Sequence, residues 1–429
     1  MRAARVPVET ASHGGAENTE EEREGGRNEG GRLDGKVAST SSATVSNSRR
    51  HAAPSKHRSL SLSKGRLVGQ ARREGGFDRL SHRVCRNDRL HRKRAAARSP
   101  DASGLCYHGA MPAQILHTLF GEDVADELRR RLPNATPLCD IIHEHHAVFM
   151  LGCQGPDVLY HNQMTRPVGL EYVSLLHRRD FGNFAAALLE LSGDYPNNPA
   201  PLVYALGFMT HALLDRQMHP YIVYKSGMAF KDAHPFLERL IDALMLELLR
   251  GQKAAQWEQA ALAAVCFSPP AALHELLFKA LVAVFPERAG KDEKLALRIA
   301  NTFQDCALFY HLTDPARGES ASYEIPRVYH YPKRFPLFID YLNLGQNRWR
   351  YPVEGGAWES ASFPALYRRA VECAFDTFLP LYSAYLERGA FPPNTAETLG
   401  NEGLSVQDRD GKPCAPTLLD PLPLELVLE

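Results

Sequence analysis

Apolar residues recur at helical spacing through most of residues 111–390, and the alternating pattern of a half-buried strand is nearly absent there. Val124, Leu128 and Leu132, for example, share one face of a helix. Proline or glycine falls between most of the periodic segments, as expected at helix boundaries. The pattern predicts an all-α domain over 111–390, followed by a loose tail over 391–429 that is rich in Pro, Gly, Asp and Asn. Helices are expected at 170–191, 202–224, 235–249, 270–284, 292–310 and 362–388.

The first 110 residues differ from the rest in charge and in aromatic content. They hold 22 Lys and Arg against 12 Asp and Glu, a net charge of +10, which leaves −10 on residues 111–429. Only Phe77 and Tyr107 of the 38 aromatic residues precede residue 111, too few large apolar groups to offset the chain entropy of folding. Residues 1–110 are therefore predicted to be a disordered basic leader, rather than a basic arm for nucleic acid or anionic lipid. The amphipathic pattern begins directly after Met111, so a leader that is not translated is the third interpretation.

Hydrophobic runs and cysteines indicate the compartment. No run of 18 or more apolar residues occurs, and no apolar stretch follows the basic N-terminus, so neither a transmembrane helix nor a secretory signal is predicted. The eight cysteines are scattered and form no Cys-x-x-Cys pair, which favours reduced thiols. The expected location is the cytoplasm.

Histidines concentrate in one part of the chain, because nine of the 18 lie between residues 117 and 234. His211, Asp215 and His219 stand at i, i+4 and i+8 in an otherwise apolar helix, so they share one face. His234 and Glu238 stand at i and i+4 on the next predicted helix. Polar groups inside a helical bundle must be paired or must bind metal. For this set of five, metal binding is favoured over histidines that are merely hydrogen-bonded in a core.

The donor types indicate which metal. Imidazole with carboxylate, and no nearby cysteine pair, suits zinc in an open catalytic site better than a closed structural one. Iron or manganese carboxylate bundles are the rival, but they use Glu-x-x-His at i and i+3, which these helices lack. Residues 152–157 (GCQGPD) add a tight turn that directs the carboxylate of Asp157. A capping role for Asp157 is the alternative there.

Five separated segments resemble the zinc-dependent phospholipase C family, in particular its cytoplasmic bacterial branch. The resemblance covers residues 111–390 and has no counterpart for 1–110. It implies an all-α, multi-helix domain with two or three zinc ions, related to single-strand-specific zinc nucleases. The segments are 111–121 (MPAQILHTLFG), 152–157, 207–222 (GFMTHALLDRQMHPYI), 234–238 (HPFLE), and a C-terminal set formed by residues 341–343 (YLN), Trp349, Pro352, Ser362 and Phe363.

The resemblance also implies a ligand set. One zinc is expected at His211 and Asp215. A second is expected at His219, His234 and Glu238. A further site is expected at His117, with Asp215 as a bridging carboxylate. Asp157 is expected to bind zinc or to orient the attacking water as general base.

One more histidine ligand is expected after the Asp157 loop, and both His161 and His177 are candidates. His177 is preferred, because it lies on one predicted helix with Phe181 and Phe184, as in this branch of the family. Secreted members also bind a zinc through the amine of an N-terminal tryptophan. This chain has no tryptophan near Met111, which leaves the third zinc without that ligand.

The expected activity is that of a phospholipase C-like phosphodiester hydrolase, in which a metal-bound hydroxide attacks a small phosphodiester or a phospholipid. A nuclease or nucleotidase is the first alternative, and it needs aromatic platforms for bases, for which Tyr160, Tyr204 and Trp349 are candidates although core packing is favoured for each. A zinc-binding domain without catalysis is the second. The charge of −10 argues against a stable nucleic-acid complex. No basic amphipathic helix for membrane docking stands out, and the sequence does not predict an oligomeric state.

Overall fold

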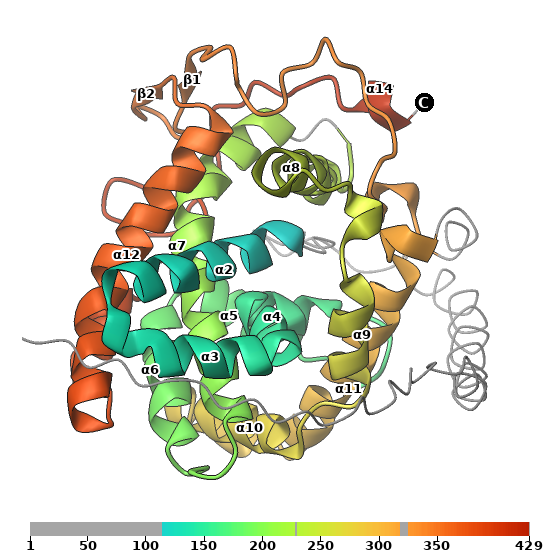
Figure 1. Cartoon of the computed structure of the whole chain (residues 1–429). Coiled ribbons are helices and arrows are strands. Elements are labelled where there is room, and N and C mark those ends of the chain that lie inside the picture. The colour runs from blue at the N-terminus through green and yellow to red at the C-terminus, as the bar shows by residue number, and fades with distance from the viewer. Residues whose placement is uncertain (1–113, 228–229, 318–324, 429) are drawn as a thin grey trace, which may run out of the picture. The chain divides into compact units, whose positions relative to one another are not determined.

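The computed structural model of the chain describes residues 114–227, 230–317 and 325–428 (Figure 1). The predicted leader 1–110 and the predicted start at Met111 lie outside these residues. The described part of the chain is all-α, as predicted, and its two short paired strands form a single hairpin.

Helices α2 to α11 come first along the described chain, the loops with the β-hairpin follow, and the long helix α12 and two short helices come last. The helices are α2 (Ile115–Arg131), α3 (Thr136–Glu144), α4 (His146–Cys153), α5 (Leu170–Arg178), α6 (Phe181–Ser192), α7 (Ala200–Ser226), α8 (Ala233–Arg250), α9 (Gln259–Phe267), α10 (Ala271–Val284), α11 (Leu295–Leu312), α12 (Phe363–Arg388), α13 (Thr395–Leu399) and α14 (Glu425–Leu428). The 3₁₀ helices are η1 (Pro133–Ala135), η2 (Gly155–His161), η3 (Ala254–Gln256), η4 (Ala289–Lys291) and η6 (Arg327–Tyr329), and the strands are β1 (Trp349–Arg350) and β2 (Trp358–Glu359).

Helix α7 runs through the centre of the domain and packs against α2, α4, α6, α8 and α12. Because it is apolar on nearly all sides, it can only be accommodated as a buried helix. Its crossing with α4 is very close: a Cβ on Gly207 would lie 2.6 Å from the carbonyl oxygen of Phe149. Glycine is therefore needed at the crossing, which brings the end of α4 and the following η2 against α7.

The predicted helix 170–191 is two helices, and this prediction was wrong at its centre. α5 ends before Arg179, which is extended, and α6 begins after Asp180, which has a φ of 62°. Aspartate is one of the few residues that tolerates this left-handed conformation. The backbone N–H groups of Asp180 and Gly182 donate to the carbonyls of Asn401 and Gly400, so a distant part of the chain stabilises the break.

The C-terminal segment also differs from the expected loose tail. Residues 391–428 bury Leu399, Leu404 and Leu424 in the main core cluster, so apolar burial anchors a segment whose composition suggested a loop. Its backbone is held as well, because the N–H of Leu422 donates to the carbonyl of Lys225 at the end of α7. The apolar positions lack helical spacing, which is why the periodic pattern stops at 390 while the packing does not.

Among the described residues, no single helix is both long enough and apolar enough to cross a bilayer. Helices α9 and α10 reach that length and composition only as a pair, with a bend of 78° between them.

Candidate metal centre

Three groups of side chains bring metal-binding donor atoms together in the described part of the chain. Within each group, one donor atom from every residue lies within 4.8 Å of the others. The residues come from α2, η2, α5, α7 and α8, so the groups exist only in the folded domain. The groups are His117, His211 and Asp215; Asp157, His177 and His211; and His219, His234 and Glu238.

Helix α7 supplies the centre of the site. Oδ2 of Asp215 lies 3.0 Å from Nε2 of His211, one turn earlier, and 3.6 Å from Nδ1 of His219, one turn later. Oδ1 of Asp215 lies 3.4 Å from Nε2 of His117 on α2. The i, i+4, i+8 spacing therefore places three donors on one face, and Asp215 stands between them with both oxygens in use.

Helix α8 completes the group around His219. Oε1 of Glu238 lies 3.0 Å from Nε2 of His234 and 3.4 Å from Nε2 of His219. His234 and Glu238 are one helical turn apart, and α8 packs on α7. The i, i+4 pair therefore faces His219, the most C-terminal of the three donors on α7.

Asp157 lies at the start of η2, directly after α4. Its Oδ1 lies 2.9 Å from Nε2 of His177 on α5, and its Oδ2 lies 3.8 Å from Nε2 of His211. The turn before it fits tightly over α7: Gly155 has a φ of +56°, and a Cβ there would lie 2.3 Å from Cγ of His211. Glycine alone permits both the conformation and the contact, so the GCQGPD loop delivers Asp157 to His211.

Backbone carbonyls fix the orientation of three of the histidines. Nδ1 of His177 bonds the carbonyl of Val173 at 3.0 Å, that of His211 the carbonyl of Cys153 at 3.3 Å, and that of His219 the carbonyl of Leu404 at 2.8 Å. A carbonyl only accepts hydrogen bonds, so each Nδ1 carries a hydrogen and each Nε2 is the nitrogen left to bind a metal ion. Those Nε2 atoms face the carboxylates of the site.

This arrangement fits a bound cation. The lone pair of His211 Nε2 and the Oδ2 atom of Asp215 are both acceptors, they are 3.0 Å apart, and both are buried without a hydrogen-bond partner. Two buried acceptors that face each other need a proton or a metal ion between them. Imidazole and carboxylate donors in this number suit zinc.

The charges of the site balance one another. Burial raises the pKa of Asp215 and of Glu238, but the neighbouring histidines outweigh it and lower both values. Burial lowers the pKa of His219, yet Asp215 and Glu238 raise it to about 10. For His117, burial and the nearby His211 lower the pKa to about 4. The carboxylates therefore stay charged and require positive charge beside them.

The sequence of this region matches the model of the zinc dependent phospholipase C family over residues 116–265. Residues 116–265 belong to the zinc-dependent phospholipase C family. No curated protein and no solved structure matches the chain. Every donor of the three groups lies inside the family segment, from His117 to Glu238.

The family segment also contains His161, which the structure places outside the three groups. Its ring is buried, stacks on Phe309 with 4.5 Å between centroids, and meets Tyr310 edge-on at 5.0 Å. Neither ring nitrogen has a hydrogen-bond partner, and burial lowers its pKa to about 3. Of the two candidate histidines, His177 is the one that lies against Asp157.

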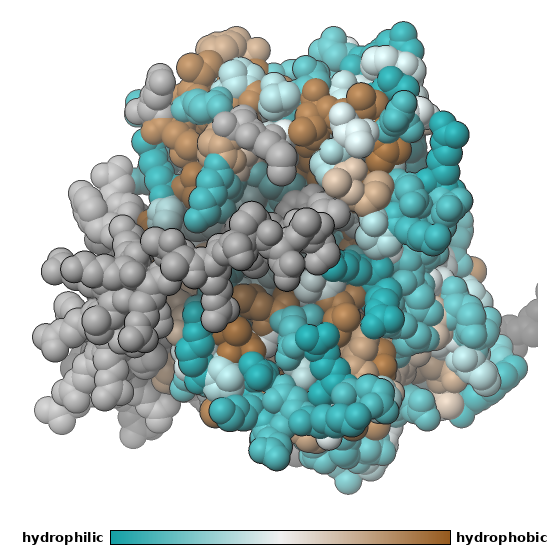
Figure 2. Space-filling model, turned by 180° about the vertical axis from the view of Figure 1, so that it is seen from behind, coloured by the Kyte–Doolittle hydropathy of each residue, from teal (hydrophilic) through white to brown (hydrophobic). Residues whose placement is uncertain are grey.

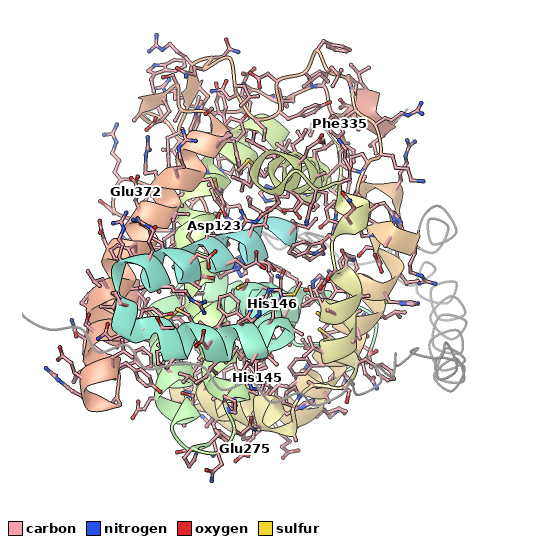
Figure 3. All side chains as sticks on the ribbon, viewed as in Figure 1. Asp123, His145, His146, Glu275, Phe335 and Glu372 are labelled. Atoms are coloured by element: carbon pink, nitrogen blue, oxygen red, sulfur yellow. The ribbon has the colours of Figure 1, made fainter. Side chains whose placement is uncertain are left out.

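Other histidines of the family segment serve elsewhere. Nε2 of His146, on α4, lies 2.8 Å from Oε1 of Glu122, and Asp123 on α2 accepts hydrogen bonds from Arg250 and Tyr367 (Figure 3). These groups form a hydrogen-bonded network on one side of α2 and α4. The high local density of histidines therefore indicated the residues of the three groups less well than the i, i+4 spacing of histidine and carboxylate did.

Sequence reasoning missed Asp242, which holds the start of α2 beside the family's metal groups. Its carboxylate accepts the backbone N–H groups of Gln114, Ile115 and Leu116 and the hydroxyl of Tyr331. His117 follows directly, so Asp242 sets the position of a donor from another helix. A signal was available, because Asp242 continues the i, i+4 spacing of His234 and Glu238.

A small, partly open pocket with room for about one water molecule adjoins the groups, between α2, α7 and α8. His117, Asp215 and Glu238 supply polar atoms to its wall. The rest is mainly apolar and includes Met218 and Ile222. An apolar surface therefore lies next to donor atoms of the three groups.

Proposed function

We propose that this protein is a zinc-dependent phosphodiester hydrolase of the phospholipase C type. The observation that carries the proposal is the position of Asp215, whose two oxygens face His211 and His117 while His219 lies one turn away. A buried carboxylate shared by two donor groups is the arrangement that a cluster of metal ions requires, and phosphodiester hydrolysis is the chemistry such clusters serve.

The tautomers limit how the donors can be divided. His211 has one free lone pair, at Nε2, because its Nδ1–H is bonded to the Cys153 carbonyl. It can therefore serve one ion, shared with Asp157, His177 and Oδ2 of Asp215. His219, His234 and Glu238 would hold a second ion. His117 and Oδ1 of Asp215 would contribute to a third, and His161 to none.

Zinc held there would act as a Lewis acid and lower the pKa of a bound water to about 7, which makes a nucleophile available at neutral pH. The chain's own residues supply the rest. Both oxygens of Asp157 face histidine Nε2 atoms, which supports a role as ligand over a role as general base.

The pocket has room for little more than a water molecule, but its apolar surroundings support a phospholipid, or another small phosphodiester with an apolar part, as substrate. Its apolar lining lies directly beside His117, Asp215 and Glu238. Of the aromatic platforms that a nuclease would need, Tyr204 and Trp349 are buried at 1% and 2% exposure, which leaves Tyr160 beside His177. A cytoplasmic location belongs to the proposal and is supported by free thiols at Cys139, Cys153, Cys266, Cys306, Cys373 and Cys414.

The test is an assay of the purified full chain, loaded with zinc, against phosphatidylcholine, single-stranded DNA and a chromogenic phosphodiester, together with elemental analysis of bound metal. Turnover of phosphatidylcholine or of the chromogenic substrate with two or three zinc ions per chain supports the proposal. Preferential cleavage of DNA would replace it with the nuclease alternative. Bound zinc without turnover of any substrate would leave a non-catalytic zinc domain.

A further inference from the structure

Large apolar side chains are exposed in the segment between η6 and α12, which consists of loops and the β1–β2 hairpin. Leu337 is 92% exposed, Phe338 79%, Leu344 60% and Trp358 53%. These four residues are named here the tip surface. In Figure 2, hydrophobic side chains lie among hydrophilic ones at the upper end of the domain, where Figure 3 labels Phe335. Apolar surface gathered in this way marks an interaction site more often than chance.

The tip surface is held in place by its neighbours. The carboxylate of Asp340 accepts the N–H groups of Leu344 and Gly345 at 2.7 and 2.8 Å, which closes the turn that follows Phe338. The side-chain amide of Asn343 donates to carbonyls on both sides of the β1–β2 hairpin, at Asn347 and Ala361. The exposed side chains therefore project from a hydrogen-bonded frame, with little ordering entropy left to lose on binding.

The segment that carries the tip surface is basic, although residues 111–429 as a whole carry −10. Residues 325–361 contain five Lys and Arg against three Asp and Glu. The guanidinium carbons of Arg348 and Arg350 lie 4.5 and 5.5 Å from the ring centre of Trp358, and Arg334 precedes Leu337 by three residues. Apolar and aromatic tips bordered by cations are complementary to a bilayer that contains anionic lipids.

We propose that the tip surface docks this protein on an anionic lipid bilayer. Leu337, Phe338, Leu344 and Trp358 enter the headgroup region, and Arg334 and Arg348 contact lipid phosphates. The docking segment is attached to the helices of the metal centre, because the carbonyl of Tyr341 accepts the hydroxyl of Tyr221, two residues after His219. The purpose of this docking, which is to bring the enzyme to a phospholipid substrate, rests on the proposed function.

Tryptophan fluorescence gives a test that is specific to this surface. Of the three tryptophans, Trp257 and Trp349 are buried and Trp358 is half exposed, so acyl-chain-brominated lipids can quench Trp358 selectively when it enters the bilayer. Full-length protein is mixed with vesicles of brominated phosphatidylcholine containing about one-third phosphatidylserine. We expect quenching in the parent protein, its loss in Trp358→Phe, and at least a tenfold weaker apparent affinity in a Leu337→Ser/Phe338→Ser double variant.

A matched control is Leu297→Ser, which removes a side chain that is 50% exposed on α11 and should leave quenching unchanged. Vesicle binding without quenching would overturn the proposal, since the basic residues 1–110 could then account for it. So would concentration-dependent self-association that the double variant abolishes, because the tip surface would then be a protein interface. Hydrolysis of a soluble chromogenic phosphodiester should be unaffected by the double variant. Absence of that hydrolysis in the parent protein, with quenching intact, would refute the proposed function and leave the docking surface standing.

Discussion

The carbonyl oxygen of Leu404 accepts a hydrogen bond from Nδ1 of His219 at 2.8 Å. The N–H of the same residue donates to the carbonyl of His177 at 2.9 Å. One residue of the C-terminal segment therefore links two helices that carry donors of different groups. Leu404 lies beyond residues 116–265, so the family segment does not contain everything that orients the donor side chains of the three groups.

Weakening this C-terminal contact should weaken zinc binding. The guanidinium of Arg216 donates to the carbonyls of Leu399, Gly400 and Glu402, and so holds the segment that precedes Leu404. We expect Arg216→Met to reduce zinc affinity by about 10- to 100-fold, the usual effect of losing a partner that orients a ligand. Competition titration with a zinc chelator measures the affinity. Arg130→Met, which breaks an exposed ion pair on α2, is the control, and an equal loss there would contradict the prediction.

Replacing Asp215 with Asn should remove metal and activity together. The amide cannot bridge two groups of donors, so we expect fewer zinc ions per chain and a loss of activity of more than about 100-fold, since loss of an orienting partner alone costs up to that much. Elemental analysis and turnover of a soluble phosphodiester measure the two effects. Asp140→Asn, at an exposed position, should change neither. Full zinc content in Asp215→Asn would show that the donor assignment is wrong.

The two candidate histidines should respond in opposite ways to substitution. His177→Ala should lower the zinc content, because its Nε2 lies against Asp157. His161→Phe should keep the zinc and raise the free energy of unfolding by up to about 1–3 kcal/mol, since the histidine buries two nitrogens without partners in an aromatic setting. Chemical denaturation and metal analysis of both variants provide the check. Loss of zinc in His161→Phe would reverse the assignment.

The pH dependence of stability should reflect Asp242. Burial raises its pKa to about 6, even though the N–H groups of Ile115 and Leu116 oppose that rise. A carboxyl whose folded-state pKa exceeds the unfolded value binds more protons when folded, so its contribution to stability is present below about pH 4 and is lost as the pH rises through about 6. We expect the free energy of unfolding of Asp242→Asn to increase, relative to that of the parent protein, by about 2–3 kcal/mol as the pH rises from 4 to 7. Urea denaturation of both proteins with a chelator present measures this difference, and parallel curves would contradict it.

The exposed side chains of the tip surface could not be predicted from the sequence pattern. In the sequence, a membrane-docking face is expected as a basic amphipathic helix, and no such helix stands out. Leu337, Phe338 and Trp358 lie in turns and a short hairpin, where no helical or strand period marks which side chains face outward. Their exposure follows from the hydrogen bonds of Asp340 and Asn343, which are visible only in the folded chain.

The sequence by itself determined the all-α fold, the face of α7 that carries His211, Asp215 and His219, and the pair on α8. Each of these follows from the helical period, which is a local property of consecutive residues. The tertiary structure decided which histidine meets Asp157, because the position of α5 depends on the helix break at Asp180, which the C-terminal segment stabilises. It also decided the hydrogen bond from His219 to the carbonyl of Leu404 and the three from the start of α2 to Asp242, which join residues more than 100 positions apart. Such contacts arise from packing of whole elements, so no local pattern in the sequence encodes them.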